Sequence, residues 1–188
     1  MFTGIVQAVG RIVRLEPLEI ECPGFDLADA AIGDSICVQG VCLTVTALAP
    51  TGFSADVSAE TRRVTAGLDR LGASVNLEKS LALGARLGGH LVAGHVDGVG
   101  EVLAFSEGVL RVRMPDALGR YVARKGSICV DGVSLTVNRI EADVFEAFLI
   151  PHTQNVTTLG RLAGGAAVNL EVDLIARYVE RLLAEQGR

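Results

Sequence analysis

The sequence predicts an all-β protein in which two similar antiparallel β-barrels follow one another along the chain and an α-helix comes after them. Three observations predict this fold. An eleven-residue segment and several shorter landmarks occur twice in the same order. Short runs of β-branched residues alternate with glycine-containing turns. The C-terminal residues carry an apolar stripe with helical spacing.

The internal repeat covers most of the chain. Residues 35–45 recur as residues 127–137, with nine of eleven positions identical at an offset of 92. Further landmarks recur in the same order at offsets of 90 to 93: Gly4 and Gly10 as Gly94 and Gly100, Thr61 to Thr65 as Thr153 to Thr157, and Val75 to Glu78 as Val168 to Glu171. Because the offset hardly changes, we expect two domains of one fold, residues 1–89 and 90–174, with residues 175–188 outside the repeat.

Within each repeat the apolar residues have the pattern of short strands. The alternating apolar residues within 36–45 are mostly β-branched and are interrupted at Gln39-Gly40. The second copy has Asp131-Gly132, a favoured hairpin dipeptide, at the same place. Residues 12–13, 99–103 and 109–114 indicate further strands. Many short strands separated by turns favour a small closed barrel, which leaves no sheet edge exposed.

Helical patterns are few. Asp116 is placed to begin a short helix that ends near residues 124–126. The clearest helix lies at the C-terminus, where apolar residues recur at helical spacing: Ile175, Tyr178, Val179, Leu182 and Leu183. This stripe has two interpretations. The helix covers the second barrel, or it packs against copies of itself in an oligomer.

Composition excludes several classes of partner. The formal net charge is −5 and no run of Lys or Arg forms a basic stripe, so we expect no nucleic-acid partner. No stretch approaches the roughly 20 apolar residues that a membrane span needs. The first residues lack the basic and long apolar regions of a secretory signal, so we expect a cytoplasmic protein.

The sequence also lacks the usual motifs for metals, nucleotides and hydrolysis. None of the four cysteines forms a CxxC pair, and the three histidines are not at a metal-ligand spacing beside them, so we expect no metal. There is no GxGxxG after a strand, no GxxxxGK[ST], no GxSxG and no HExxH. Reduced thiols are the simpler interpretation of the cysteines.

Polar positions at which the two copies differ are the candidates for separate chemical roles. Cys42 corresponds to Ser134, Ile5 to His95 and Ser80 to Asp173. Each has a structural alternative: Cys42 as a small core residue, Asp173 as a helix N-cap, and one of the two nearby histidines, His90 and His95, as a surface residue.

Six motifs, in order over essentially the whole chain, resemble those of the riboflavin synthase family. They are Met1 to Val6, Gln39 to Val45, Gly88 to His95, Lys125 to Val137, Leu149 to Thr153, and Val168 to Asp173. One departure is the segment between Arg14 and Pro23, which is shorter than in most members and trims a surface hairpin.

The resemblance implies two six-stranded Greek-key β-barrels, a C-terminal helix and a homotrimer. It implies the dismutation of two 6,7-dimethyl-8-ribityllumazine molecules to riboflavin and 5-amino-6-ribitylamino-pyrimidinedione, with no cofactor. Each barrel would hold one lumazine, and the productive site would join the first barrel of one subunit to the second barrel of a neighbour. Association with lumazine synthase is left open.

The resemblance also implies site residues. The catalytic set is His95, Ser134, Cys42, Asp173, Ser35 and Thr136. In this set His95 transfers protons at the reacting methyl and Asp173 orients or accepts protons. The substrate-binding set is Phe2, Gly4, Ile5, Val6, Cys42, Leu43, Thr44, Asp56, Val57, Ser58, Ala59, Glu60, Thr61, Gly94, His95, Val96, Lys125, Ser134, Leu135, Thr136, Phe148, Leu149, Ile150, Pro151, His152 and Thr153.

Two other classes of function are alternatives to the synthase activity. A non-catalytic lumazine- or flavin-binding protein of the same fold, of the antenna type, would bind the heterocycle without converting it. A tandem-barrel interaction module would leave the polar differences between the repeats unexplained. Incubation with the lumazine alone separates the three.

Overall fold

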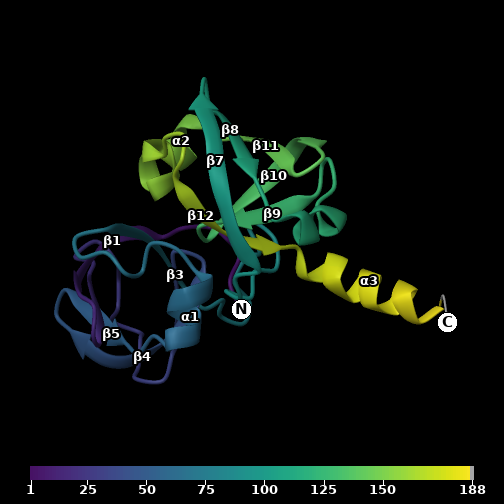
Figure 1. The fold of residues 1–188 in the computed structure, drawn as a ribbon. Helices are drawn as coiled ribbons and strands as arrows, with labels where there is room; N and C mark the ends of the chain where they lie inside the picture. The colour runs from purple at the N-terminus through teal and green to yellow at the C-terminus, as the bar shows by residue number, and fades with distance from the viewer. Residues whose placement is uncertain (187–188) are drawn as a thin grey trace.

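The computed structural model describes residues 1–186 as two β-barrels, with a helix that extends from the second barrel (Figure 1). The last two residues of the helix expected over 175–188 lie outside the described residues. The fold class expected from the sequence, two six-stranded antiparallel barrels and a C-terminal helix, is confirmed.

The first barrel contains six strands: β1 (Ala8–Arg14), β2 (Leu18–Glu21), β3 (Ser35–Val38), β4 (Val41–Ala49), β5 (Gly52–Ala55) and β6 (Ser74–Lys79). They close in the order β1-β2-β5-β4-β3-β6, with every pairing antiparallel. Strands β3, β4 and β5 follow one another through tight connections and β6 returns beside β3, which is the Greek-key order. The short helix α1 (Ala59–Val64) lies between β5 and β6 in the chain.

The second barrel repeats this topology. Its strands are β7 (Gly98–Ser106), β8 (Val109–Arg113), β9 (Ser127–Val130), β10 (Val133–Glu141), β11 (Val144–Phe148) and β12 (Ala167–Val172). Its helical segments are the 3₁₀-helix η1 (Asp116–Tyr121), α2 (Pro151–Val156) and the 3₁₀-helix η2 (Thr158–Arg161). The strands close in the order β10-β11-β8-β7-β12-β9, which matches the first barrel strand for strand.

Backbone conformation explains the matched hairpins. Gln39 and Gly40 have φ of 51° and 85°, and Asp131 and Gly132 have φ of 49° and 81°. Two successive positive φ values are those of the type I′ turn, which suits the twist of paired strands. The hairpins expected at these dipeptides are therefore confirmed, with β3–β4 and β9–β10 on either side.

The helices differ from expectation in detail. The segment that begins at Asp116 is a 3₁₀-helix that ends at Tyr121, before residues 124–126. Helices α1 and α2 have only six residues each and no buried side chain, so they leave no apolar stripe in the sequence. Ser58 begins α1 by accepting a hydrogen bond from the Thr61 amide at 3.0 Å.

Each barrel encloses its own hydrophobic core, and a third cluster lies between the barrels. The large buried side chains include Phe53 in the first core and Phe145 in the second. The cluster between them joins Phe2 and Val92 to the thiols of Cys37 and Cys129. These two cysteines are core residues, as free cysteine usually is.

A polar seam also joins the barrels. The Asn76 side chain donates to the Asp131 carbonyl at 2.8 Å, and the Asn169 side chain donates to the Gln39 carbonyl at 2.9 Å. The hairpin turns are so close that a Cβ on Gly40 would lie 2.9 Å from the Gly132 nitrogen. Equivalent residues thus meet across an approximate two-fold axis.

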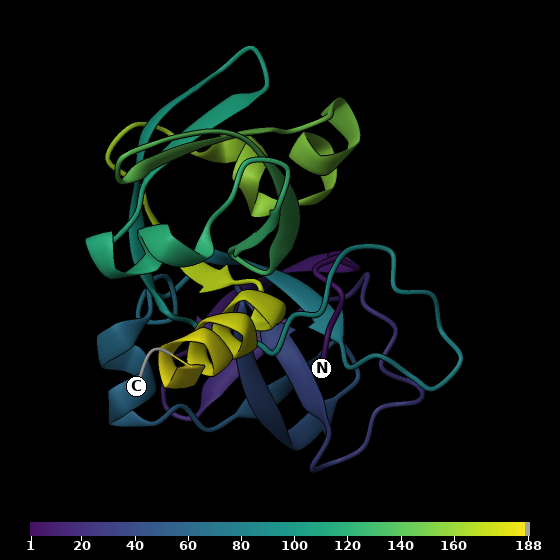
Figure 2. The same ribbon diagram turned by 90° about the vertical axis from the view of Figure 1, so that its right-hand side faces the viewer.

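The C-terminal helix α3 (Leu174–Gln186) extends away from the second barrel (Figure 1). Turned by 90°, it stands in front of the region where the barrels meet (Figure 2). Its apolar stripe does not cover the second barrel, because the large apolar side chains are 48–65% exposed: Ile175, Tyr178, Val179, Leu182 and Leu183. Within the described residues, no helix has the length and apolar character needed to cross a membrane.

Candidate functional site

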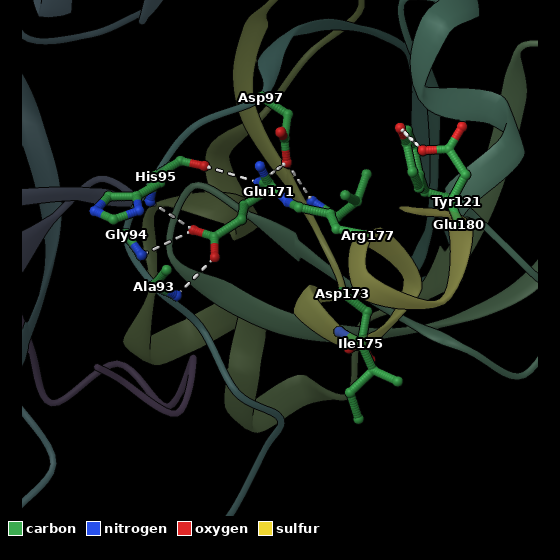
Figure 3. Close-up of polar contacts among 11 residues, drawn as sticks. Ala93, Gly94, His95, Asp97, Tyr121, Glu171, Asp173, Ile175, Arg177 and Glu180 are labelled. Atoms are coloured by element: carbon green, nitrogen blue, oxygen red, sulfur yellow. Dashed lines mark hydrogen bonds and ion pairs between the residues drawn. The ribbon is translucent and has the colours of Figure 1, made fainter. Parts of the chain in front are cut away.

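Two short segments, residues 3–5 and 93–95, precede the first strand of each barrel, and we name them the first and second lead-in turns. In the second, one carboxylate holds three successive amides: Glu171 accepts from Ala93 N at 2.6 Å, and from Gly94 N and His95 N at 2.9 Å (Figure 3). Glu171 extends from β12 of the same repeat.

The first lead-in turn has the matching arrangement. Glu78 on β6 accepts from the Thr3 amide at 2.7 Å, from the Thr3 hydroxyl at 2.6 Å and from the Gly4 amide at 2.9 Å. Burial raises the pKa of both Glu78 and Glu171, while these hydrogen bonds act in the opposite direction. Each carboxylate is therefore a buried anchor for one turn.

Each lead-in turn lies against the opposite barrel. The Ser134 amide donates to the Gly4 carbonyl at 2.7 Å, and the Cys42 amide donates to the Gly94 carbonyl at 2.8 Å. A Cβ on Gly4 would lie 2.6 Å from Ser134 Cβ, and one on Gly94 would lie 2.7 Å from Cys42 Cβ. Both positions need glycine, for this closeness and for positive φ values of 74° and 78°.

Side-chain packing follows the same crossing. Val6 packs against the core of the second barrel, and Val96 packs against the core of the first. Phe2 and Val92 pair as an isolated antiparallel bridge between the two crossing segments. The matched candidates Cys42 and Ser134 are thus each covered by the other repeat.

Ser134 has a histidine partner that the sequence analysis did not assign. His90 Nδ1 lies 2.7 Å from Ser134 Oγ, and the His90 ring is buried. Burial lowers the pKa of His90, and the nearby Asp173 carboxylate opposes this shift. Either the hydroxyl or the imidazole donates in this bond, according to which ring nitrogen carries the proton, and His90 Nε2 is buried with no hydrogen-bond partner among the described residues. Serine, histidine and aspartate thus form one cluster at the second barrel.

Asp173 has a structural role as well. Its side chain accepts a hydrogen bond from the Ile175 amide at 3.0 Å at the start of α3. The N-cap expected from the sequence is therefore confirmed, and the same carboxylate lies close enough to His90 to influence its pKa.

The remaining strand candidates lie on matched hairpins. Ser35 pairs with Thr44 across β3 and β4, and Thr136 holds the position of Thr44 in β10. Both threonines are exposed on the outer faces of the barrels. The side chains of Leu43 and Leu135 point into the barrel cores. Only the backbone of these two residues is therefore accessible from the outer faces.

The other substrate-binding candidates follow β5 and β11. Residues 56–61 lead from β5 into the first turn of α1, and residues 148–153 lead from β11 into α2. Leu149 is fully buried, whereas Phe148 and Ile150 are half-exposed. Lys125 is exposed, with a positive φ of 69°, and its amide donates to the Val137 carbonyl at 2.7 Å.

The structure does not join all candidates in one cavity. His95 is exposed, and the hydroxyl of Ser134 pairs with His90 instead. A groove of about 1010 Å³ between the barrels is lined by Gln39, Asp131 and the segments around residues 66–74 and 158–167, which hold none of the candidates. A smaller hollow of about 410 Å³ lies beside Ile5 and Glu78.

Sequence reasoning missed three acidic or basic groups that organise these turns. His90, Glu78 and Glu171 all lie inside motifs that were identified, yet they received no role. The signal for the two glutamates was available, because a glutamate that recurs at the same place in both copies indicates a shared structural acceptor. The burial of His90 depends on a distant contact, its amide donating to the Thr3 carbonyl at 3.1 Å.

Known proteins resemble the chain in sequence and in structure. The lumazine binding domain family matches residues 3–80 and 93–173. Riboflavin synthase of Mycobacterium tuberculosis is 50% identical over 202 residues, covering 100% of both chains. Riboflavin synthases of Photobacterium leiognathi and Bacillus subtilis are 44% and 40% identical, each over 97% of this chain and 89% and 90% of their own.

Solved structures of the protein LumP show a similar fold. LumP complexed with riboflavin has a TM-score of 0.80 and 28% identity, covering 92% of this chain and 99% of its own. LumP complexed with 6,7-dimethyl-8-(1'-D-ribityl) lumazine has the same TM-score and coverage with 26% identity.

Proposed function

The chain belongs to the riboflavin synthase family, and from this membership we propose that each of its two barrels holds one molecule of the lumazine substrate. It is a transferase that converts two molecules of 6,7-dimethyl-8-ribityllumazine into riboflavin and 5-amino-6-ribitylamino-pyrimidinedione by transfer of a four-carbon unit. We assign substrate binding to two units, residues 1–89 and 90–174, and assembly to the C-terminal residues 175–188.

The observation that carries this proposal is the pair of matched positions with unlike side chains. Cys42 and Ser134 occupy equivalent places, each beside a glycine of the other repeat's lead-in turn. Equivalent backbone suits two identical ligands, and unlike side chains suit a reaction in which one ligand donates carbon and the other accepts it. Thr44 and Thr136 add a hydroxyl beside each position.

The reaction needs a proton to leave the C7 methyl of one lumazine, whose anion delocalises into the heterocycle. We assign proton transfer at this methyl to His95. Ser134, paired with His90 and with Asp173 nearby, is a second group able to pass a proton at the second barrel. A positioned acid or base typically contributes about 10²–10⁴-fold to the rate.

Positioning of the two lumazines supplies the other part of the rate enhancement. Holding two reactants in register contributes up to about 7–11 kcal/mol of the barrier. We assign binding in the first barrel to Cys42, Thr44 and residues 56–61, and binding in the second to Ser134, Thr136 and residues 148–153. Ser35, Phe2 and Lys125 complete the surroundings of the heterocycles and their ribityl chains.

The assembly we propose is a homotrimer in the cytoplasm, in which the productive site lies between subunits. The exposed apolar stripe of α3 supports self-association, because single exposed stripes of this kind mark interaction sites. A site shared between subunits also accounts for candidates on the outer faces of both barrels. Association with a lumazine synthase remains compatible with this arrangement.

The test is incubation of the purified chain with 6,7-dimethyl-8-ribityllumazine and no other reactant. We expect riboflavin to form, with two lumazines consumed for each riboflavin produced. A chain that binds the lumazine tightly and leaves it unchanged would instead act as a binding protein, the activity that the ligand-bound LumP structures support as the second candidate.

A further inference from the structure

Asp97 and Gln7 are equivalent residues that perform the same backbone task. The Gln7 side chain accepts a hydrogen bond from the Lys79 amide at 2.9 Å, and Asp97 Oδ2 accepts one from the Val172 amide at 2.8 Å. Each closes the space between the first and last strands of its barrel. A neutral amide is sufficient for this task in the first repeat, so the negative charge in the second repeat serves another purpose.

That purpose is an ion pair with the C-terminal helix. Arg177 Nη2 of α3 lies 2.5 Å from Asp97 Oδ2, and the Asp97 side chain is only 14% exposed. The same Nη2 donates to the His95 carbonyl at 3.4 Å. Arg177 Nε is buried and has no hydrogen-bond partner within residues 1–186, while the Arg177 side chain as a whole is 37% exposed.

A second contact fixes the helix one turn later. Glu180 of α3 accepts a hydrogen bond from the Tyr121 hydroxyl (Figure 3). It also accepts one from the Arg120 guanidinium, and both donors belong to η1. Arg177 and Glu180 share the face of α3 that is turned toward the second barrel. Two contacts on one face restrict both the position and the rotation of α3 relative to the second barrel. They keep the Arg177 guanidinium beside the second lead-in turn.

The second lead-in turn therefore has an anchor that the first lacks in the described residues. Glu78 and Glu171 hold the amides of both turns, but the carbonyl of His95 is additionally held by the helix. Figure 3 shows the His95 imidazole pointing away from Asp97 and Arg177, so neither group occupies the space in front of the ring. The Asp97 carboxylate is close enough to interact electrostatically with His95.

We propose that Arg177 and Asp97 are positioning residues that clamp the backbone of His95 to helix α3 and so set the direction of its imidazole. This inference rests on the proposed role of His95 in the reaction. Neither residue touches the lumazine in this account. The clamp acts on the rate because a displacement of about 1 Å of a reacting group can cost about 10²-fold.

Three substitutions and one control test the clamp. Asp97→Gln copies the first repeat, keeps the acceptor for the Val172 amide and removes the ion pair. Arg177→Gln removes the pair from the other side, and Arg177→Lys retains the positive charge. Arg139→Gln is the control, because Arg139 pairs with Glu141 on β10 with both side chains 61% exposed, outside the clamp.

We expect Asp97→Gln and Arg177→Gln each to lower kcat about tenfold while KM changes less than about twofold, with the double variant no worse than either single one. Arg177→Lys regains part of the rate, and Arg139→Gln matches the wild type. Hydrogen exchange at the His95 amide, measured by NMR, becomes faster in both Gln variants, while exchange at the Gly4 amide stays unchanged.

Unchanged kcat and unchanged exchange at His95 in the Gln variants would overturn the proposal. So would equal acceleration of exchange throughout the second barrel, since that result would show a general stabilising role. If the wild-type chain forms no riboflavin, the proposed function fails, and the exchange at His95 still decides whether the clamp exists.

Discussion

Ser134 and Cys42 place unlike side chains at one backbone position of the repeat. The Ser134 hydroxyl lies 2.7 Å from a buried histidine whose pKa is lowered by burial, whereas Cys42 presents a partly buried thiol at the end of the β3–β4 turn. The backbone contacts are alike in both places: the distances from the Ser134 amide to the Gly4 carbonyl and from the Cys42 amide to the Gly94 carbonyl agree within 0.1 Å. The difference between the two sites therefore lies in the side chains alone.

Replacing Ser134 or His95 by alanine tests their assigned roles. We expect Ser134→Ala and His95→Ala to lower turnover about 100-fold, because each removes a group to which we assign proton transfer, while lumazine affinity falls much less. Steady-state kinetics and equilibrium titration of lumazine fluorescence measure the two effects. Ser106→Ala, at an exposed position at the end of β7, is the matched control. Equal losses of turnover and affinity would show that these residues only bind.

The sequence was sufficient to predict that Ser134 and Cys42 occupy matched positions and that Asp173 caps a helix, but not the histidine partner of Ser134. A five-residue separation between His90 and His95 indicated opposite faces of a strand. The segment is instead a crossing lead-in, in which only Val92 forms an isolated bridge. His90 is buried by Thr3, which lies 87 positions earlier in the sequence, and no local pattern records such a contact.

At the scale of elements, the two lead-in turns tie the barrels into one unit. Strand patterns predicted the hairpins because type I′ turns and alternating apolar residues are local features. The sequence did not predict that each lead-in turn packs against the opposite barrel. Both barrels carry the same hairpin motif, so the sequence does not say which of the two hairpins a given turn contacts. Only the packed structure shows that Val6 enters the second core and Val96 the first.

Glu171 and Glu78 allow the lead-in turns to be tested in a matched pair. Replacing either glutamate by glutamine turns one acceptor oxygen into an NH₂ group that faces an amide, so a buried donor loses its partner. We expect Glu171→Gln and Glu78→Gln each to lower the free energy of unfolding by about 2 kcal/mol. Thermal denaturation followed by circular dichroism measures the effect. Unfolding temperatures within about 1 °C of the wild type would contradict the role of these carboxylates as anchors.

At the scale of the whole molecule, a single buried carboxyl at the seam makes stability depend on pH. Burial raises the pKa of Asp131 from its ordinary value of 3.8 to about 7, while hydrogen bonds from the Asn169 amide and the Gln39 side chain act in the opposite direction. Because the folded state binds this proton more tightly, its contribution is complete below about pH 4 and is lost as pH rises through about 7. The difference corresponds to about 4 kcal/mol.

Asp131→Asn removes this dependence while keeping an oxygen acceptor for the Asn169 amide. We expect the variant and the wild type to unfold at similar temperatures at about pH 3.5, where the carboxyl is protonated in the native state and mostly protonated in the unfolded chain. At about pH 8 the variant unfolds at the higher temperature, because it carries no buried charge. Thermal melts at both values measure the difference. A difference in unfolding temperature between the variant and the wild type that stays constant over this pH range would contradict a buried Asp131 that loses its proton within it.

The apolar face of α3 links the fold of one chain to the proposed assembly. We expect Leu182→Glu, at a residue 62% exposed in the single chain, to leave the barrels folded and to dissociate the assembly. We then expect turnover to fall, because in the proposed assembly the productive site lies between subunits. Light scattering coupled to size-exclusion chromatography gives the mass, and circular dichroism reports the fold. A dissociated variant with full turnover would contradict a site shared between subunits.

The claim on which the account depends is that two unlike, matched positions each hold one lumazine, and calorimetric titration tests it most directly. The ligand is a ribityllumazine analogue that lacks the C7 methyl and so binds without reacting. We predict two molecules bound per chain, one class weakened by Thr44→Val and the other by Thr136→Val. Binding of a single molecule per chain, or equal weakening of all binding by either substitution, would contradict the account.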